Sequence, residues 1–316
     1  MKKFTSVTDI DNLDSWIKKA LEVKSNPLAN KHIGANKTIG LLFFNPSLRT
    51  RMSTQKAAQN LGMNVMIMNL NNDGWQIELE DGAVMNQGSQ EHIKEAAEVI
   101  SQYCDIVGLR TFPSLTDKKK DYEDYVLNKF LENIKVPLVS LESAILHPLQ
   151  SFADAITIFE NKTVKKPKVV LTWAPHPKAL PQAVANSFVE WMKQDKVELV
   201  IANPEGFDLA AEFTEGCTIT HNQEEAFEAA DFIYAKNWSS YEDYGKIGEN
   251  LENWTVDEAK MSLTNNAKFM HCLPVRRNVV VTDGVLDSEA SIVMQQANNR
   301  TYAAQTVLLN ILDNGH

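Results

Sequence analysis

The chain has 316 residues, of which 44% are hydrophobic and 23% charged, and its formal net charge is −10. This length allows two packed domains, and the composition is that of an ordinary globular protein. The acidic balance argues against nucleic acid or an anionic membrane as a partner. An anionic ligand would therefore need a local basic pocket.

The three cysteines are far apart and form no C-x-x-C pair. This usage indicates a reducing compartment and argues against a zinc site. The N-terminal residues 1–5 run into polar, helix-like sequence, without a signal peptide or an apolar run of about 18 residues. We therefore expect a cytoplasmic protein that is not bound to a membrane.

Apolar runs rich in β-formers alternate with helical patterns, which predicts α/β architecture with mainly parallel sheets. A long helix at 147–160 joins the two halves of the chain. In the first half, strands are predicted at 38–44, 64–70, 105–110 and 137–141, and helices at about 8–24, 47–61, 90–103 and 121–133.

The second half restarts with a strand at 168–173 and a helix at 181–193. Further strands are predicted at 197–202, 217–220, 231–236, 268–271 and 291–294, before a last helix at about 297–313. We predict two doubly wound domains with an interdomain cleft. The first covers 1–146, with a C-terminal helix at about 297–316 packing back on it, and the second covers 147–296.

The segment Ser47-Leu48-Arg49-Thr50-Arg51 stands where the first predicted strand passes into a helix. Ser47 is a good N-cap, and a helix start offers free N–H groups and the positive end of the dipole. Arginines and hydroxyls added there predict a phosphate site. For this motif alone, a solvated basic helix start is the alternative.

Cations also stand at other strand ends, where ligands bind in open parallel sheets. The third strand ends at Arg110, and the fourth ends at Glu142, ahead of His147-Pro148-Leu149-Gln150. Singly, Arg110 fits a surface ion pair and His147 a helix cap. Together with Arg49 they favour an anion site.

Three motifs, in this order, resemble those of the carbamoyltransferases, the family of the aspartate and ornithine enzymes. They are Ser47-Leu48-Arg49-Thr50-Arg51, His147-Pro148-Leu149-Gln150 and His271-Cys272-Leu273-Pro274. The resemblance spans nearly the whole chain and implies a carbamoyl-phosphate domain, then an amino-acid domain, and a homotrimer with shared active sites. Carbamoyl phosphate is already activated, so we expect no metal, cofactor or covalent intermediate.

One departure from the ornithine enzymes is informative. Those enzymes hold the α-amino group with an Asp-x-x-x-Ser-Met-Gly loop, whereas Lys236-Asn237-Trp238 stands here. This segment, the Trp173–Pro177 loop and Trp75 resemble the branch that acts on N-acylated ornithine. An acylated nitrogen is a neutral amide, which would leave a dedicated aspartate unpaired.

The acyl group is succinyl or acetyl. Pro181-Gln182-Ala183-Val184 resembles the succinylornithine enzymes. Gln90, in a loop that reaches a neighbouring active site in the family, matches neither the glutamate of acetyl users nor the proline of succinyl users. A succinyl group ends in a second carboxylate, which a glutamate would repel and a glutamine would not. We predict succinyl first and acetyl next.

The resemblance thus implies transfer of a carbamoyl group to the δ-amine of an N2-acyl-L-ornithine, in arginine biosynthesis. Arg110, His147 and Thr50 are the expected catalytic residues. Carbamoyl phosphate is expected to contact Ser47, Leu48, Arg49, Thr50, Trp75, Arg110, His147, Gln150, Cys272, Leu273 and Arg300. The acylornithine is expected to contact Glu142, His176, Lys236, Arg276 and Gln90. Arg277 is expected to form a structural ion pair, and the alternative is that it shares the role of Arg276.

Two alternatives remain at this stage: an ordinary ornithine carbamoyltransferase, and a non-catalytic anion-binding relative. A nucleotide-binding protein is disfavoured, because the first strand is not followed by G-x-G-x-x-G and the chain has no G-x-x-x-x-G-K-[ST].

Overall fold

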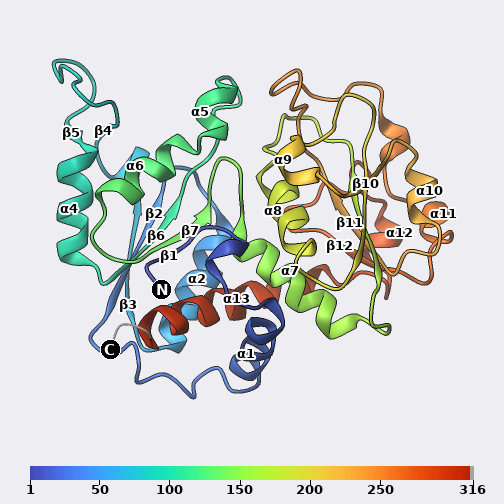
Figure 1. Cartoon of the computed structure of the whole chain (residues 1–316), viewed down its shortest axis with the longest axis horizontal. Helices are drawn as coiled ribbons and strands as arrows, with labels where there is room; N and C mark the ends of the chain where they lie inside the picture. Colours follow the sequence, from blue (N-terminus) through green and yellow to red (C-terminus); the bar gives the residue numbers. More distant parts are fainter. Residues whose placement is uncertain (314–316) are drawn as a thin grey trace. The chain divides into compact units, whose positions relative to one another are not determined.

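The computed structural model describes residues 1–313, and the chain divides into two compact units (Figure 1). Unit 1 comprises Met1–Leu149 and Arg300–His316, and unit 2 comprises Gln150–Asn299. Residues 314–316, to which the C-terminal helix was predicted to extend, lie outside the described residues. No helix in residues 1–313 has the length and apolar character that a membrane span requires.

Unit 1 is built on a parallel sheet of five strands in the order β1-β7-β6-β2-β3. Its central strands are almost wholly buried, as expected for a parallel sheet covered on both faces. The strands are β1 (Lys3–Phe4), β2 (Thr38–Phe43), β3 (Asn64–Asn69), β6 (Ile106–Arg110) and β7 (Leu138–Glu142). A separate pair, β4 (Ile77–Glu78) and β5 (Glu91–His92), lies in the long connection after β3.

Helices cover both faces of this sheet (Figure 1). The helices on one face are α1 (Leu13–Ser25), α2 (Leu48–Asn60) and the end of α13 (Val293–Asp313). Those on the other face are α4 (Ile93–Tyr103) and α6 (Tyr125–Asn133), which enclose an apolar core around Phe130 and Leu109. The shorter elements are η1 (Val7–Asp9), α3 (Leu70–Asp73) and α5 (Lys118–Tyr122).

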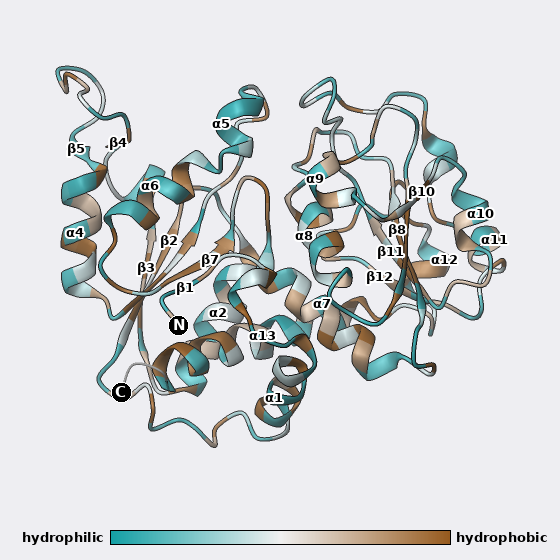
Figure 2. Ribbon diagram, viewed as in Figure 1, coloured by the Kyte–Doolittle hydropathy of each residue, from teal (hydrophilic) through white to brown (hydrophobic). Residues whose placement is uncertain are grey.

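Unit 2 repeats the architecture with a parallel sheet in the order β10-β9-β8-β11-β12. Its strands are β8 (Lys168–Trp173), β9 (Glu198–Ala202), β10 (Thr218–Thr220), β11 (Phe232–Lys236) and β12 (Lys268–Met270). The helices are α7 (Pro148–Asn161), α8 (Ala183–Met192), α9 (Ala211–Thr214), α10 (Gln223–Phe227), η2 (Glu252–Trp254), α11 (Glu258–Met261) and α12 (Asp283–Leu286). Figure 2 shows the apolar strands inside both units and hydrophilic residues on the outer helices.

The α/β class and the parallel sheets are confirmed, but some elements differ from the prediction. The prediction of a strand at 291–294 is wrong, because this apolar run leads into α13. Within this run, only Ser291 forms a β-bridge, to Phe269. The helix predicted at 121–133 is divided at Asp124, which has a left-handed φ of 48°. The helix predicted at 8–24 is divided as well, because Asn12 caps a new helix at Leu13.

Candidate active site

The first part of the site is the turn from β2 into α2. Ser47 is the N-cap, as predicted, and its Oγ accepts a hydrogen bond of 3.3 Å from the Thr50 N–H. The first turn of α2 contains no acidic residue, so the positive end of the helix dipole is not offset there. Arg49 and Arg51 are half-buried in this turn. The segment can therefore offer backbone donors and cations to one anion.

Arg110 braces two strand ends, because β6 lies between β7 and β2 in the sheet. Its Nε and Nη2 donate to Glu142 Oε2 at 3.0 and 2.7 Å. Its Nη1 donates to the carbonyl oxygens of Asn45 and Pro46 at 2.9 and 3.0 Å. Arg110 is only 8% exposed, so its guanidinium is held by charge-assisted bonds in a poorly solvated site.

The predicted substrate residue Glu142 is therefore already engaged in an ion pair with Arg110. This pair was not anticipated from the sequence. Each residue ends a strand, and only the strand order reveals that the two strands are neighbours. Its role toward an acylornithine stays a prediction.

Thr50, His147 and Arg300 meet beside this ion pair. Arg300 Nη2 donates to Thr50 Oγ1 at 2.6 Å, and its Nη1 lies 3.5 Å from His147 Nε2. His147 Nε2 in turn lies 3.7 Å from Glu142 Oε2. All three residues are buried. We call Thr50, Arg110, Glu142, His147 and Arg300 the arginine cluster, which contains two guanidiniums and one carboxylate.

Trp75 and Gln90 lie elsewhere in unit 1, in the connection between β3 and α4. Both side chains are exposed, Trp75 by 52%. The Trp75 indole N–H donates to Glu91 Oε2 at 2.7 Å, and the Gln90 backbone N–H donates to the Gln76 carbonyl oxygen at 3.1 Å. Both predicted residues thus stand on a protein surface.

In unit 2, Gln150 is buried in the first turn of α7. Its Nε2 donates to Asp154 Oδ1 at 2.7 Å. Asp154 was missed by the sequence analysis, although a polar residue four positions after Gln150 on a helix is a usable signal.

The predicted segment His271–Leu273 follows β12 directly. The His271 N–H donates to Gln296 Oε1, and the Leu273 N–H donates to His271 Nδ1, both at 2.9 Å. Leu273 has a left-handed φ of 54°, which is uncommon for a side chain of its size. Cys272 is half-buried and is not part of a disulfide. The segment is therefore an irregular turn whose main chain is held by side chains.

A second cationic group lies in unit 2. We call it the histidine cluster, and it consists of His176, Lys236 and Arg276. Arg276 Nε donates to His176 Nε2 at 3.1 Å. Burial, with the charges of Lys236 and Arg276, lowers the pKa of His176 below its usual 6.5. The neutral form of the ring is therefore favoured at pH 7, and Nδ1 lies 2.9 Å from the Lys178 carbonyl oxygen and 3.1 Å from the Lys178 backbone nitrogen.

The other members of this cluster differ in exposure. Lys236 ends β11, is 7% exposed and donates to the Asn237 carbonyl oxygen at 2.7 Å. Arg276 is exposed. The neighbouring Arg277 donates to Asp283 and Asp287 at 2.7–2.8 Å, which confirms the prediction of a structural ion pair.

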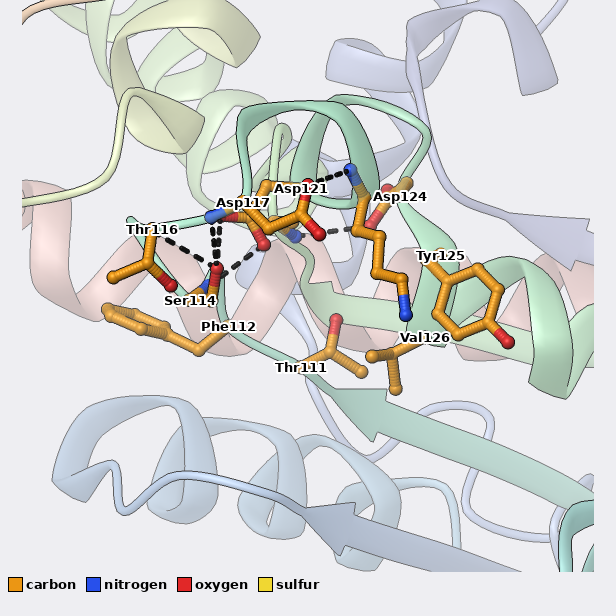
Figure 3. A pocket seen from close by; sticks show the side chains of 11 residues that line it. Thr111, Phe112, Ser114, Thr116, Asp117, Asp121, Asp124, Tyr125 and Val126 are labelled. Carbon is orange, nitrogen blue, oxygen red and sulfur yellow. Dashed lines mark hydrogen bonds between the residues drawn. The ribbon is translucent and has the colours of Figure 1, made fainter. Parts of the chain in front are cut away.

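A cavity of about 280 Å³ opens beyond the carboxyl end of β6 (Figure 3). None of the predicted site residues lines it. Asp121 and Asp124 lie in its wall, where Asp121 accepts from the Ser114 and Leu115 N–H groups and Asp124 accepts from the Ala144 N–H at 3.2 Å. Burial raises the pKa of Asp124 to about 6. These carboxyls hold loops together.

The part of the chain that the structure describes contains no group of three or more His, Cys, Asp or Glu side chains arranged to hold a metal ion. The described site is therefore one of arginines, histidines and hydrogen-bonding side chains.

The chain is similar to known proteins over nearly its whole length. Residues 2–160 match the family model "Aspartate/ornithine carbamoyltransferase, carbamoyl-P binding domain", and residues 181–311 match the model "Aspartate/ornithine carbamoyltransferase, Asp/Orn binding domain". The chain is 49% identical over 316 residues to N-succinylornithine carbamoyltransferase of Bacteroides fragilis, covering 99% of each chain. It is 36% identical over 331 residues to N-acetylornithine carbamoyltransferase of Xanthomonas axonopodis pv. citri, covering 98% and 96%.

Solved structures are also similar. An N-acetyl-L-ornithine transcarbamylase variant complexed with carbamyl phosphate and N-succinyl-L-norvaline has a TM-score of 0.92 and 34% identity, covering 98% of this chain and 100% of that chain. In that complex and three others with the same ligands, one glutamate is replaced by alanine, valine, proline or serine.

Proposed function

Since this chain belongs to the aspartate/ornithine carbamoyltransferase family, we propose that it moves the carbamoyl group of carbamoyl phosphate to the δ-amine of an N2-acyl-L-ornithine. The products are an N-acylcitrulline and phosphate, in arginine biosynthesis. The observation that carries this proposal is the arginine cluster, in which Arg110 and Arg300 are fixed beside His147 and Thr50.

Carbamoyl phosphate would bind at the start of α2. Ser47, Leu48, Arg49 and Thr50 would hold the phosphate with backbone N–H groups, hydroxyls and charge, with Trp75 and Arg300 assisting. Arg110, His147 and Thr50 would donate to the carbonyl oxygen. Because these donors are positioned before the reaction, they can stabilise the oxyanion that develops as the amine attacks.

The carbamoyl NH₂ needs acceptors on its other side. The Gln150 side chain and the main chain at Cys272 and Leu273 are our candidates. The attacking amine must first lose a proton, although a free alkyl amine has a pKa of about 10. Desolvation and nearby cations would lower that pKa, and the departing phosphate would accept the proton of the tetrahedral intermediate.

The acylornithine would bind at the histidine cluster. Its carboxylate needs a cation, which Lys236 or Arg276 supplies, and Arg276 is held for this purpose by His176. Glu142 would contribute to acylornithine binding through its ion pair with Arg110. Gln90 would contribute from the surface loop. The substrate would thus be recognised mainly by positive charge.

We propose a succinyl group as the acyl group, with acetyl next. The relatives named for succinylornithine are more similar to this chain than those named for acetylornithine. Replacing one glutamate in an acetylornithine enzyme is compatible with a bound succinyl compound, and Gln90 likewise places no negative charge in the corresponding loop.

We further propose a homotrimer with shared sites, in the cytoplasm. Exposed apolar side chains on α2 and on the edge strand β3 support an interface: Leu48, Met52, Met66 and Met68. The exposed Trp75 can serve a neighbouring site only in such an assembly. Mixing inactive Arg110→Ala and Trp75→Ala subunits should restore activity, because some sites in the hybrids would receive both native residues.

The proposal is tested by measuring citrulline-type product from carbamoyl phosphate with free, acetylated and succinylated ornithine. We expect the highest kcat/KM with N-succinylornithine. An equal or better kcat/KM with free ornithine would identify an ordinary ornithine carbamoyltransferase. Calorimetric binding of carbamoyl phosphate without turnover of any acceptor would identify a non-catalytic relative.

A further inference from the structure

A buried carboxylate in unit 2 connects both candidate acceptors of the carbamoyl NH₂ group. Asp154 lies on α7, one helical turn after Gln150, and its exposed fraction is 0%. Its Oδ1 accepts hydrogen bonds from Gln150 Nε2 and from Gln296 Nε2, each at 2.7 Å. One carboxylate oxygen thus accepts from two amides.

The orientation of both amides follows from a backbone donor. Gln296 Oε1 accepts the His271 N–H at 2.9 Å, and a backbone N–H can only donate. The NH₂ of Gln296 must therefore face Asp154, whose Oδ1 is an acceptor. Because Oδ1 accepts, Gln150 also presents its NH₂ to Asp154, and its carbonyl oxygen points away from the carboxylate.

The surroundings keep this arrangement polar and fixed. Tyr234 is fully buried, and its burial, with the nearby Asp154 and Cys272, raises its pKa well above the ordinary value. It therefore remains a neutral phenol beside the carboxylate. Through Gln296 and His271, the same carboxylate also supports the segment that precedes Leu273.

We propose that Asp154 is a positioning residue that turns the Gln150 carbonyl oxygen toward the carbamoyl NH₂. This inference rests on the proposed function. An amide group has a donor end and an acceptor end, and only the acceptor end can receive an NH₂. Without the carboxylate, Gln150 could present either end, and selection of a carbamoyl over an acetyl group would fall.

The test compares carbamoyl phosphate with acetyl phosphate, in which a methyl group replaces the NH₂. Both are measured as ligands of the full-length protein, acetyl phosphate as a competitive inhibitor. Asp154→Leu removes the acceptor oxygens, whereas Asp154→Asn retains an oxygen for the two amides. Asp154→Ala, which leaves room for water, serves if the leucine variant does not fold.

In Asp154→Leu we expect kcat/KM for carbamoyl phosphate to fall about 10- to 100-fold, as for a buried hydrogen bond left unmade. The preference for carbamoyl over acetyl phosphate should fall about 10-fold, with the KM for acylornithine unchanged. Asp154→Asn should restore the preference. In a Gln150→Ala background, Asp154→Leu should have no further effect on the preference for carbamoyl over acetyl phosphate.

Equal weakening of both phosphates would overturn the inference, because it would indicate a merely structural role. An unchanged preference in Asp154→Leu or Asp154→Ala would overturn it as well. A wild-type protein without preference for carbamoyl phosphate would instead overturn the proposed function, and the inference with it.

Discussion

The arginine cluster of unit 1 and the histidine cluster of unit 2 hold their cations in different ways. In the first, Arg110 and Arg300 are buried and bonded to residues of other elements. In the second, Arg276 is exposed and is held by a neutral ring at 3.1 Å. In the proposed reaction, the first cluster would be preorganised for a small, highly charged donor, whereas the second could adapt to a longer acceptor.

This difference has an energetic reason. Buried charges lose hydration, so they are stable only when several bonds fix them in good geometry. Such bonds leave little freedom to follow a ligand. An exposed guanidinium keeps much of its hydration, so few hydrogen bonds suffice to orient it, and it can therefore move with the substrate.

The largest effect is expected for Arg110→Ala. We expect kcat to fall by about 10²- to 10³-fold, because one preorganised donor to the developing oxyanion is lost. We also expect the free energy of unfolding to fall by about 3–5 kcal/mol, because Glu142 is left as a buried unpaired charge. Steady-state kinetics and urea denaturation measure the two effects.

The double variant Arg110→Ala/Glu142→Ala should regain part of the stability but none of the activity. Arg277→Ala is a matched control, because it removes an exposed ion pair and should change kcat little. A kcat of Arg110→Ala close to that of the wild type would contradict the role given to the arginine cluster.

The next effect separates the two substrates. Arg49→Ala should raise the KM for carbamoyl phosphate by about 10- to 100-fold, since it removes a charge-assisted contact to phosphate. Lys236→Ala should mainly raise the KM for the acylornithine. If both changes affected only carbamoyl phosphate, the proposed division between the units would be wrong.

A smaller effect concerns pH. The pKa of His176 lies below 6.5, so its Nε2 accepts from Arg276 above that range. As the pH falls through this pKa, the added proton removes the acceptor and places a positive charge beside Arg276. Because Arg276 then loses the acceptor that orients it, we expect the KM for acylornithine to rise a few-fold as the pH falls below the pKa of His176.

In His176→Gln, which has an amide that does not titrate in this range, this limb of the pH profile should disappear. The KM for carbamoyl phosphate provides the control, because its cluster does not include His176. A pH profile for acylornithine identical in the two proteins would refute this explanation.

The smallest effect on activity is expected at Asp124, in the wall of the cavity shown in Figure 3. Its pKa is about 6 in the folded protein and 3.8 in the unfolded reference, so the folded state binds the proton more tightly. Stability from this group is therefore present below about pH 4 and lost as the pH rises through 6.

Asp124→Asn should raise the free energy of unfolding by about 1–3 kcal/mol at pH 8 and by little at pH 4. Asparagine also tolerates the left-handed φ of 48°. Thermal or urea unfolding at the two pH values measures the difference, and kcat should not change. A stabilisation of equal size at both pH values would exclude this titration as its cause.

Local patterns predicted most of the strands and long helices, because apolar runs and Ser47 carry their signal within a few residues. They did not predict β1 or the β4–β5 pair, which are only two residues long each and depend on distant partners. The run at 291–294 was ambiguous, since a short apolar segment fits a strand or a buried helix.

The site shows the same limit. The sequence predicted which cations stand at strand ends, but the contacts among them depend on strand order and on α13. The bond of Arg110 to Glu142 depends on which strands are neighbours in the sheet, and the bond of Gln150 to Asp154 depends on which side chains share a face of α7. The sequence motifs contain neither kind of information. The interdomain cleft and the individual substrate contacts stay predictions.

The bond between Arg300 and Thr50 joins residues 250 positions apart, and that between Asn60 and Gln305 joins residues 245 apart. During translation, unit 1 can therefore be completed only after α13 has been synthesised and has docked. Until the ribosome has released that helix, a nascent chain has the turn from β2 into α2 but lacks Arg300 as the partner of Thr50. We expect the capacity to bind the donor to arise only after that step.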